Sequence, residues 1–279
     1  MKINHLFLGL LVGSILVISC TNDFNPITFT SSLETALANS DYVEELILND
    51  QELEELPPNI GVLKKLKVLQ VSDNLLTSLP ESIGDLSELE FFTVDQNQIE
   101  SIPSTIGNIG SLKYLWLENN EIQLLPQSIG SLELLETLRL SENNLVSLPP
   151  SVGDLQNLQF LSLHRNQLLT LPDWIGNLTN LTELSAGRNQ FTTIPESIGE
   201  LINLEYLGLS FNQLTTLPAS IGNLTNLKEL YLVGNNLSSL PSSIENLTNL
   251  RRLYLNDNNF TTDQINSIQN ILPNCIVYN

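Results

Sequence analysis

Apolar side chains recur along this chain with a period of 23 residues. From Val43 to Leu250 the period runs without insertion or deletion, and each unit reads L-x-x-L-x-L-x-x-N-x-L-x-x-L-P-x-x-I-G-x-L-x-x. Nine complete units and part of a tenth follow this consensus. A fixed period of this length is typical of solenoids, in which each unit forms one coil and neighbouring coils share a core.

The unit that begins at Leu112 shows which elements the pattern predicts. Leu115 and Leu117 alternate at period two, which indicates a short strand with one buried face. The later aliphatic residues return by a path without strand periodicity, in which Pro126 fixes the backbone and Gly130 permits a tight turn. A single coil cannot enclose its own aliphatic side chains. Stacked coils bury them, and each fully buried aliphatic contributes about 1.5–3 kcal/mol.

Asparagine fills the ninth position of almost every unit. Its carboxamide can both donate to and accept from backbone groups of an adjacent coil, so we expect these residues to be structural. Gln51 replaces the asparagine in the first unit, and Glu245 replaces the usual glycine in the ninth. The column consists of Asn74, Asn97, Asn120, Asn143, Asn166, Asn189, Asn212, Asn235 and Asn258.

These features together resemble the leucine-rich repeats, and the Leu-Pro-x-x-Ile-Gly-x-Leu half resembles the subclass of Ras-group scaffold proteins and many bacterial surface proteins. The resemblance covers residues 43 to about 260. It implies an α/β fold: a right-handed solenoid, or horseshoe, with a concave parallel sheet and 3₁₀ or extended segments on the convex side. Members of this family mostly bind proteins or peptides on the concave sheet.

The ends of the repeat array predict short capping helices. Ser31 and Glu34 have the spacing of a capping box, which indicates an amphipathic helix within residues 31–42. At the other end the repeat register is lost after residue 260, and apolar residues at helical spacing stop at Pro273. We therefore expect a carboxy-terminal cap over residues 261–279, with Cys275 as a small buried apolar residue.

The first 19 residues have the pattern of a secretory signal. Lys2 precedes an apolar run that is too short to span a membrane. The following Val17-Ile18-Ser19-Cys20 resembles the lipobox of bacterial lipoproteins, which implies removal of residues 1–19 and lipidation of Cys20. Residues 20–30 then form a polar tether. An ordinary signal peptide with a chance cysteine is the alternative. Since no aspartate follows Cys20, the resemblance favours the outer membrane or cell surface.

The predicted strands also define a candidate binding surface. If repeat positions four and six point inward, positions three, five and seven point outward on the concave side, where aromatic and basic residues gather. Such residues dominate binding hot spots because they bury large areas and supply directed hydrogen bonds. Trp116 and Tyr254 lie six coils apart, or roughly 29 Å, which fits an extended peptide or a protein edge. The candidate residues are Phe91, Tyr114, Trp116, Arg139, Phe160, His164, Arg165, Arg188, Tyr206, Phe211, Tyr231 and Tyr254.

Other interpretations of this surface stay open. Aromatic residues favour strands in any sheet, and Arg139 can simply pair with Glu118 or Glu142 on neighbouring coils. Flat rings also stack on sugars, so a glycan is an alternative ligand. The rival of another class is a structural or adhesive surface protein that makes its contacts through the convex face or the ends.

Charge excludes two classes of partner. The chain carries 31 acidic against 11 basic residues, and its formal net charge of -20 repels nucleic acids and anionic membrane surfaces. We therefore expect a monomer whose partner is a protein, a peptide or a glycan. Its only membrane contact would be the lipid on Cys20.

The sequence offers little for catalysis. His164 is the only histidine outside the predicted signal, so a histidine-based zinc cluster cannot form. Ser141 or Ser162 with His164 and Asp95 has the composition of a catalytic triad, but no nucleophile elbow, phosphate loop or metal motif accompanies them. Asp95 and Glu118 are oxygen ligands of the kind that calcium prefers, but a solvated acidic face explains these two residues better than a calcium site. The sequence therefore predicts a binding protein that needs no cofactor or metal.

Overall fold

The computed structural model describes residues 28–279, and its strands form one parallel sheet in chain order. From β2 to β11 each strand pairs with its neighbour in a register of one repeat, as in the pairing of Leu115 with Leu138. The strands are β1 (Phe29–Thr30), β2 (Glu45–Ile47), β3 (Val68–Gln70), β4 (Phe91–Thr93), β5 (Tyr114–Trp116), β6 (Thr137–Arg139), β7 (Phe160–Ser162), β8 (Glu183–Ser185), β9 (Tyr206–Gly208), β10 (Glu229–Tyr231), β11 (Arg252–Tyr254) and β12 (Ile276–Tyr278).

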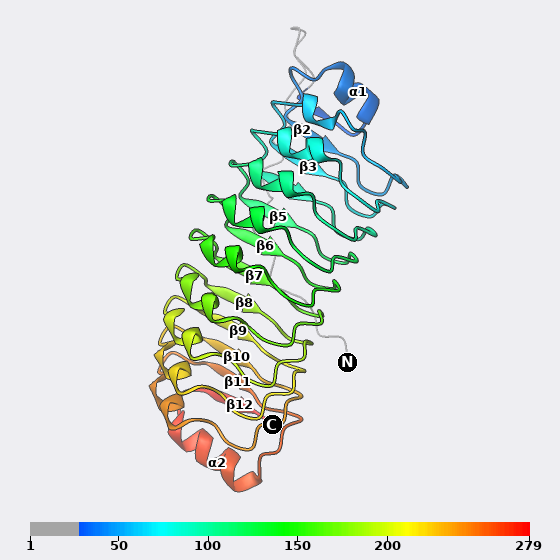
Figure 1. The fold of residues 1–279 in the computed structure, drawn as a ribbon. Helices are drawn as coiled ribbons and strands as arrows, with labels where there is room; N and C mark the ends of the chain where they lie inside the picture. Colours follow the sequence, from blue (N-terminus) through cyan, green and yellow to red (C-terminus); the bar gives the residue numbers. More distant parts are fainter. Residues whose placement is uncertain (1–27) are drawn as a thin grey trace, which may run out of the picture.

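A row of 3₁₀ helices completes the coils. Figure 1 shows the coils stacked along the long axis of the molecule, with these helices in a row beside the sheet and an α-helix at each end. In the described residues they are η1 (Ile60–Val62), η2 (Glu81–Asp85), η3 (Ser104–Asn108), η4 (Gln127–Ser131), η5 (Pro150–Asp154), η6 (Asp173–Asn177), η7 (Glu196–Glu200), η8 (Ala219–Asn223) and η9 (Ser242–Asn246). The predicted solenoid, with its parallel sheet and 3₁₀ segments, is confirmed.

The core is one continuous apolar cluster that runs through all the coils. Leu115 at the centre of β5 and Leu117 just after it are fully buried, whereas Trp116 between them is only partly buried. Side chains at repeat positions three and five therefore lie on the concave face, as the alternation predicts.

The asparagine column links each coil to the coil before it. The Nδ2 of Asn120 donates to the carbonyl oxygen of Val94 at 3.0 Å, and its Oδ1 accepts the amide of Ile99 at 3.0 Å. The same bonds recur at Asn143, where the distances are 2.8 Å to Leu117 and 3.0 Å to Ile122. Buried backbone groups that the turn leaves unpaired are satisfied in this way.

One backbone requirement was not apparent from the sequence pattern. The residue at repeat position eight adopts a positive φ in all ten coils. Asp, Asn and Gly tolerate this conformation, but Phe211, with φ of 58°, is a bulky residue in a region that such residues rarely occupy.

Both ends of the solenoid differ in detail from the prediction. The helix α1 (Leu33–Ala38) is capped by Ser32, whose side chain accepts the amide of Thr35, so the predicted Ser31–Glu34 capping box is wrong. The terminal helix α2 (Thr262–Ile271) has a capping box between Thr261 and Gln264.

The sheet is also longer than the repeat pattern indicates. Phe29 and Thr30, which end the predicted tether, form β1 and pair with β2. Residues 276–278 form β12 and pair with β11, although the sequence analysis gave them no strand. Within the described range no helix is long and apolar enough to cross a membrane. The predicted signal and Cys20 lie outside that range.

Candidate binding surface

The concave face brings the predicted site residues into one long strip. Eight of them lie on strands: Phe91 on β4, Tyr114 and Trp116 on β5, Arg139 on β6, Phe160 on β7, Tyr206 on β9, Tyr231 on β10 and Tyr254 on β11. The other four follow strands, with His164 and Arg165 after β7, Arg188 after β8 and Phe211 after β9. The fold thus places all twelve along the concave side or at its rim.

Four residues on consecutive strands form what we call the aromatic–arginine cluster: Phe91, Trp116, Arg139 and Phe160. The rings of Phe91 and Trp116 meet edge to face, with centroids 4.9 Å apart. The guanidinium of Arg139 lies 4.2 Å from the centroid of the Trp116 ring and 5.3 Å from that of Phe160. Tyr114 lies beside the cluster, and the centroid of its ring is 6.2 Å from that of Phe91. Ring contacts hold the Arg139 guanidinium in place.

The cluster contains two hydrogen-bond donors without acceptors. The Nε1 of Trp116 and the Nε of Arg139 are both buried, and neither has a partner among the described residues. A buried donor left unpaired costs about 1–3 kcal/mol, and an acceptor on a ligand would remove that cost. Arg139 also lies 3.8 Å from Glu118, so its predicted pairing with that residue occurs, whereas Glu142 pairs with Arg165 at 3.0 Å.

Desolvated carboxylates border the cluster. Asp95 accepts the amide of Glu118 at 2.6 Å and the hydroxyl of Thr93 at 3.1 Å. Burial nevertheless raises the pKa of Asp95 from 3.8 to about 6, and burial also raises the pKa of Glu118. On β8, burial raises the pKa of Glu183 as well. Three carboxyl groups thus share the concave face with Arg139, and burial makes their ionised forms less favourable.

A second feature, the tyrosine stack, occupies the carboxy-terminal part of the sheet. Tyr206, Tyr231, Tyr254 and Tyr278 follow one another on β9 to β12, with successive ring centroids 5.0, 4.2 and 4.4 Å apart. Tyr278 is not among the predicted site residues, because the repeat register ends before it. The run of β-branched and aromatic residues Ile276-Val277-Tyr278 is the signal that could have indicated this last strand.

Acidic groups also line the tyrosine stack. The hydroxyl of Tyr231 donates to Glu229 at 2.6 Å, and Glu229 pairs with Arg252 at 2.8 Å. Burial, together with the charges of Glu183 and Glu229, raises the pKa of Tyr206 to about 12. Burial therefore favours the neutral form of the Tyr206 hydroxyl, and the Tyr231 hydroxyl is held by Glu229.

At the rim of the sheet, Arg188 stacks on Phe211 with its guanidinium 4.3 Å from the ring centroid. A side chain at Gly234 would meet the Phe211 ring at 2.6 Å, so the glycine makes room for that ring. Arg188 has no ion pair among the described residues, whereas Arg165 pairs with Glu142. The predicted basic island is thus only partly neutralised.

The contacts around the imagined catalytic residues are those of a structural network. The hydroxyls of Ser141 and Ser162 form a hydrogen bond with each other, and both oxygens of Asp95 accept the bonds described above. The imidazole of His164 lies over Gly187, where a side chain would meet its Nδ1 at 3.1 Å. Over residues 28–279 no group of three or more His, Cys, Asp or Glu side chains could hold a metal ion.

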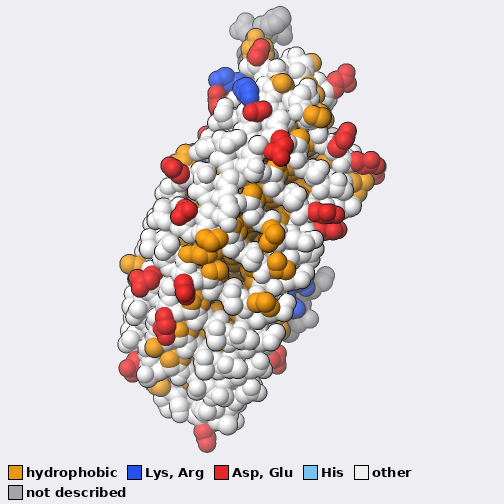
Figure 2. Space-filling view, viewed as in Figure 1, with side chains coloured by type: hydrophobic (Ala, Val, Ile, Leu, Met, Phe, Trp, Pro, Cys, Tyr) orange, Lys and Arg blue, Asp and Glu red, His pale blue; other side chains and the backbone are white. Residues whose placement is uncertain are grey.

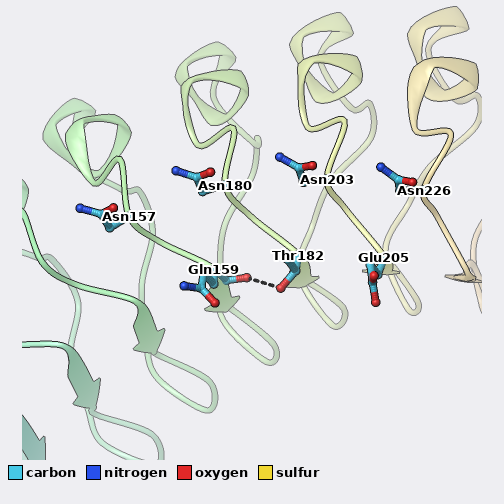
Figure 3. Close-up of a pocket in the computed structure, with 7 residues that line it drawn as sticks. All are labelled: Asn157, Gln159, Asn180, Thr182, Asn203, Glu205 and Asn226. Carbon is cyan, nitrogen blue, oxygen red and sulfur yellow. Dashed lines mark hydrogen bonds between the residues drawn. The ribbon is translucent and has the colours of Figure 1, made fainter.

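A polar groove of about 520 Å³ runs along the flank of the solenoid, between the 3₁₀ helices and the strands (Figure 3). Asn157, Asn180, Asn203 and Asn226 line it, and each donates its amide to a backbone carbonyl of the preceding coil at 2.7–2.9 Å. The lining contains no aromatic ring and no cation. Composition therefore favours the concave face over this groove as a site for a macromolecule.

Figure 2 shows acidic side chains scattered along the visible face and very few basic ones. This agrees with the formal net charge of -20. Such a surface attracts positively charged partners over distances of about one Debye length, roughly 8 Å at physiological salt.

Comparison with solved structures gives the chain its relatives. It is 31% identical to a leucine-rich repeat protein of Leptospira interrogans, over 86% of this chain and 73% of that one, with a TM-score of 0.55. A TDR receptor is 31% identical over 83% of this chain and 42% of its own, with a TM-score of 0.75. A plant peptide hormone receptor in complex with RGF2 is 28% identical over 85% of this chain and 47% of its own, with a TM-score of 0.59.

Family models match most of the repeat array. Residues 103–196 and 189–272 match the leucine-rich repeat region, and residues 41–99 match the leucine rich repeat. No curated protein is significantly similar to the chain. Leucine-rich repeat proteins are generally binding modules without enzymatic activity. Because the first model alone covers more than half of the sequence, the chain belongs to the leucine-rich repeat family.

Proposed function

We propose that this protein is a recognition module that binds an extended segment of a protein or peptide along its concave face. The observation that carries the proposal is the aromatic–arginine cluster, in which Trp116 and Arg139 hold buried donors that find no acceptor among residues 28–279. Main-chain carbonyl groups of an extended segment are acceptors of the right kind. Among the similar structures, one is described as a peptide hormone receptor, which supports a peptide ligand.

The electrostatics favour a partner segment with net positive charge. Asp95, Glu118 and Glu183 are desolvated on the concave face, and the whole chain is strongly acidic. Basic side chains on the partner would stabilise the ionised forms of these carboxyl groups and speed association.

The tyrosine stack speaks against the glycan alternative. A sugar binds an aromatic residue through the ring face, but Tyr231 and Tyr254 each have a neighbouring ring 4.2 Å away, and Tyr254 has Tyr278 on its other side. Their faces are therefore occupied within the protein, which leaves hydroxyls and ring edges for a ligand.

The two tryptophans of the chain permit a direct test. Trp116 lies on the concave face and Trp174 lies in η6, so a Trp174→Phe protein has its only indole at the proposed site. Random peptides of about ten residues, long enough to span the strip, would be selected on the full chain and titrated while Trp116 fluorescence is recorded. We expect the Trp116 signal to change on binding.

Variants then locate the site. Trp116→Ala and Arg139→Glu should each raise the dissociation constant of the selected peptides at least tenfold, because hot-spot truncations cost about 2 kcal/mol or more. Binding to Trp116→Ala, which lacks the fluorescent indole, is measured by calorimetry. Arg251→Glu is the matched control, since Arg251 is exposed and lies on the flank. If the peptides bind both concave variants as tightly as they bind the parent, the concave face is not the binding site. That result would favour the structural or adhesive alternative.

We further propose that Cys20 is lipidated and anchors the protein at the bacterial cell envelope. The lipobox-like Val17-Ile18-Ser19-Cys20 supports this, and the tether that follows would let the solenoid stand off the membrane. In bacterial cells fed labelled palmitate, we expect label in the parent and none in Cys20→Ser. Cys275→Ser is the control and should keep the label. If the parent takes up no label, the lipidation proposal is wrong, and an ordinary signal peptide is the remaining interpretation of residues 1–19.

A further inference from the structure

In the part of the chain that the structure describes, the outer edge of β12 is an unpaired strand edge. The amide of Ile276 donates to the carbonyl oxygen of Arg251 at 2.9 Å, and the amide of Leu255 donates to that of Tyr278 at 2.7 Å, so residues 276 and 278 bond inward to β11. Backbone groups alternate sides along a strand, which turns the amide and carbonyl of Val277 outward. Among residues 28–279 no strand pairs with that edge.

The side chains at this edge are apolar and exposed. Ile276 is 57% exposed and Tyr278 is 37% exposed, although both stand on the concave side of the sheet. Nearby on α2, Ile271 is 47% exposed. Proteins protect a free edge with charged side chains, proline, a bulge or a short strand; β12 has no charge, proline or bulge, and only its length of 3 residues limits pairing. An edge of this kind favours pairing with another strand.

Charge indicates which partner the edge can accept. After Asp257 the printed sequence carries a single charged side chain, Asp263, whereas the chain as a whole has a net charge of -20. Figure 1 places α2 and β12 together at one end of the molecule. Two copies of this acidic protein would repel each other over most of their surfaces and least at this end.

We propose that two copies of the chain pair tail to tail through antiparallel β12 strands. With Val277 opposite Val277 of the second copy, the two residues exchange both of their outward hydrogen bonds. The same register sets Ile276 opposite Tyr278 of the second copy, twice, on one face of the sheet, and aromatic–β-branched pairs stabilise antiparallel strands. The arrangement has two-fold symmetry, so assembly stops at the dimer. It replaces the monomer expected from the sequence.

Sedimentation equilibrium of the full chain in density-matched detergent tests the proposal. We expect a reversible dimer, weak because the interface is small. Val277→Pro removes the outward donor without removing a bond to β11, and Tyr278→Lys adds charge at the edge. Each should raise the dissociation constant at least tenfold, whereas Ile202→Lys, an exposed apolar position elsewhere, should leave it unchanged. Circular dichroism would check folding, and Tyr278→Lys decides the outcome if Val277→Pro disturbs the cap.

Disulfide trapping is a second test, because copies that associate through other segments would not bring residue 277 of each copy together. Opposed residues of a hydrogen-bonded antiparallel pair have Cα atoms about 5.5 Å apart, within disulfide range. Val277→Cys should give a covalent dimer under mild oxidation. All of these proteins carry Cys20→Ser, so that the buried Cys275 is their only other thiol. Ser267→Cys on α2 and the unsubstituted Cys20→Ser protein should not form the covalent dimer. A protein that stays monomeric, a dimer unaffected by both edge variants, or equal trapping at 267 and 277 would overturn the proposal.

Discussion

At the scale of single residues, the concave face combines groups that stabilise the fold with groups that the fold leaves strained or unpaired. Asn120 satisfies backbone groups of the preceding coil, whereas Trp116 and Arg139 each keep a buried donor that has no acceptor in the described part of the chain. Asp95 is partly satisfied but desolvated, and its pKa is raised to about 6. Residues of the second kind keep a polar group whose cost to the folded state a ligand can offset, which suits them to binding.

Asp95 gives a prediction about pH. Its pKa of about 6 in the folded protein lies above the ordinary 3.8, so the folded state favours the protonated form. This contribution is fully present below pH 4 and is lost as the pH rises to about 6, at a cost of up to about 3 kcal/mol. Asp95→Asn should therefore be more stable than the parent at pH 7 in urea unfolding, and the difference should shrink toward pH 4.

An exposed acid provides the control for this measurement. Asp154→Asn in η5 should follow the parent at every pH, because Asp154 is exposed. If Asp95→Asn shows the same dependence on pH as the parent between pH 4 and 6, desolvation of Asp95 does not influence stability.

At the scale of elements, the 3₁₀ helices pack closely enough to restrict residue size. A Cβ atom at Gly130 in η4 would lie 2.4 Å from the backbone oxygen of Ser151 in η5. The repeat glycine is therefore needed for contact between coils and not for a positive φ. In the ninth coil Glu245 takes this place and is exposed, and the coil that follows holds α2 instead of a 3₁₀ helix.

Gly130→Ala should consequently destabilise the protein. The added methyl group meets backbone that cannot move far, and overpacking of this kind costs about 1–3 kcal/mol. Gly110→Ala is the control, because nothing lies within 4 Å of its Cβ position, and it should leave stability unchanged or slightly raised. Thermal unfolding of the two variants side by side measures the difference, and equal midpoints would refute the packing argument.

The elements also show how far the sequence could predict the structure. The period of 23 residues predicted the strands, the buried leucines and the residues that share the concave face, because every coil repeats the same packing. It could not predict β12, the cap at Ser32 or the contact between Tyr254 and Tyr278, since these depend on segments outside the register. The unpaired donors of Trp116 and Arg139 depend on side-chain geometry, which periodicity does not specify.

At the scale of the whole molecule, short-range packing opposes long-range repulsion. Each coil contacts mainly its two neighbours, so stability is close to a sum of intercoil terms. Exposed ion pairs between coils add little, about 0–1 kcal/mol each. They join Lys67 to Glu44, Lys113 to Glu90, and Lys228 to Glu205. Repulsion among the excess acidic residues, which give the net charge of -20, opposes the packing of the coils along the whole molecule.

Salt should therefore stabilise this protein. Raising sodium chloride from about 0.01 M to about 1 M shortens the Debye length from about 30 to about 3 Å and screens the repulsion among the excess acids. We expect the thermal midpoint to rise through this range. If the intercoil ion pairs dominated instead, screening would weaken them and the midpoint would fall.

The strands β2 to β11 are evenly spaced. They therefore set a regular spacing of contacts for any ligand that lies across them along the long axis of the solenoid. Strands recur about every 4.8 Å, whereas an extended peptide advances about 3.3 Å per residue. Three residues of such a ligand therefore span about the same length as two coils. Because successive side chains of an extended strand point to opposite faces, a side chain that faces the sheet at an equivalent position returns only after six residues, which span four coils. Partners with side chains of similar chemistry at a six-residue interval would fit this spacing best.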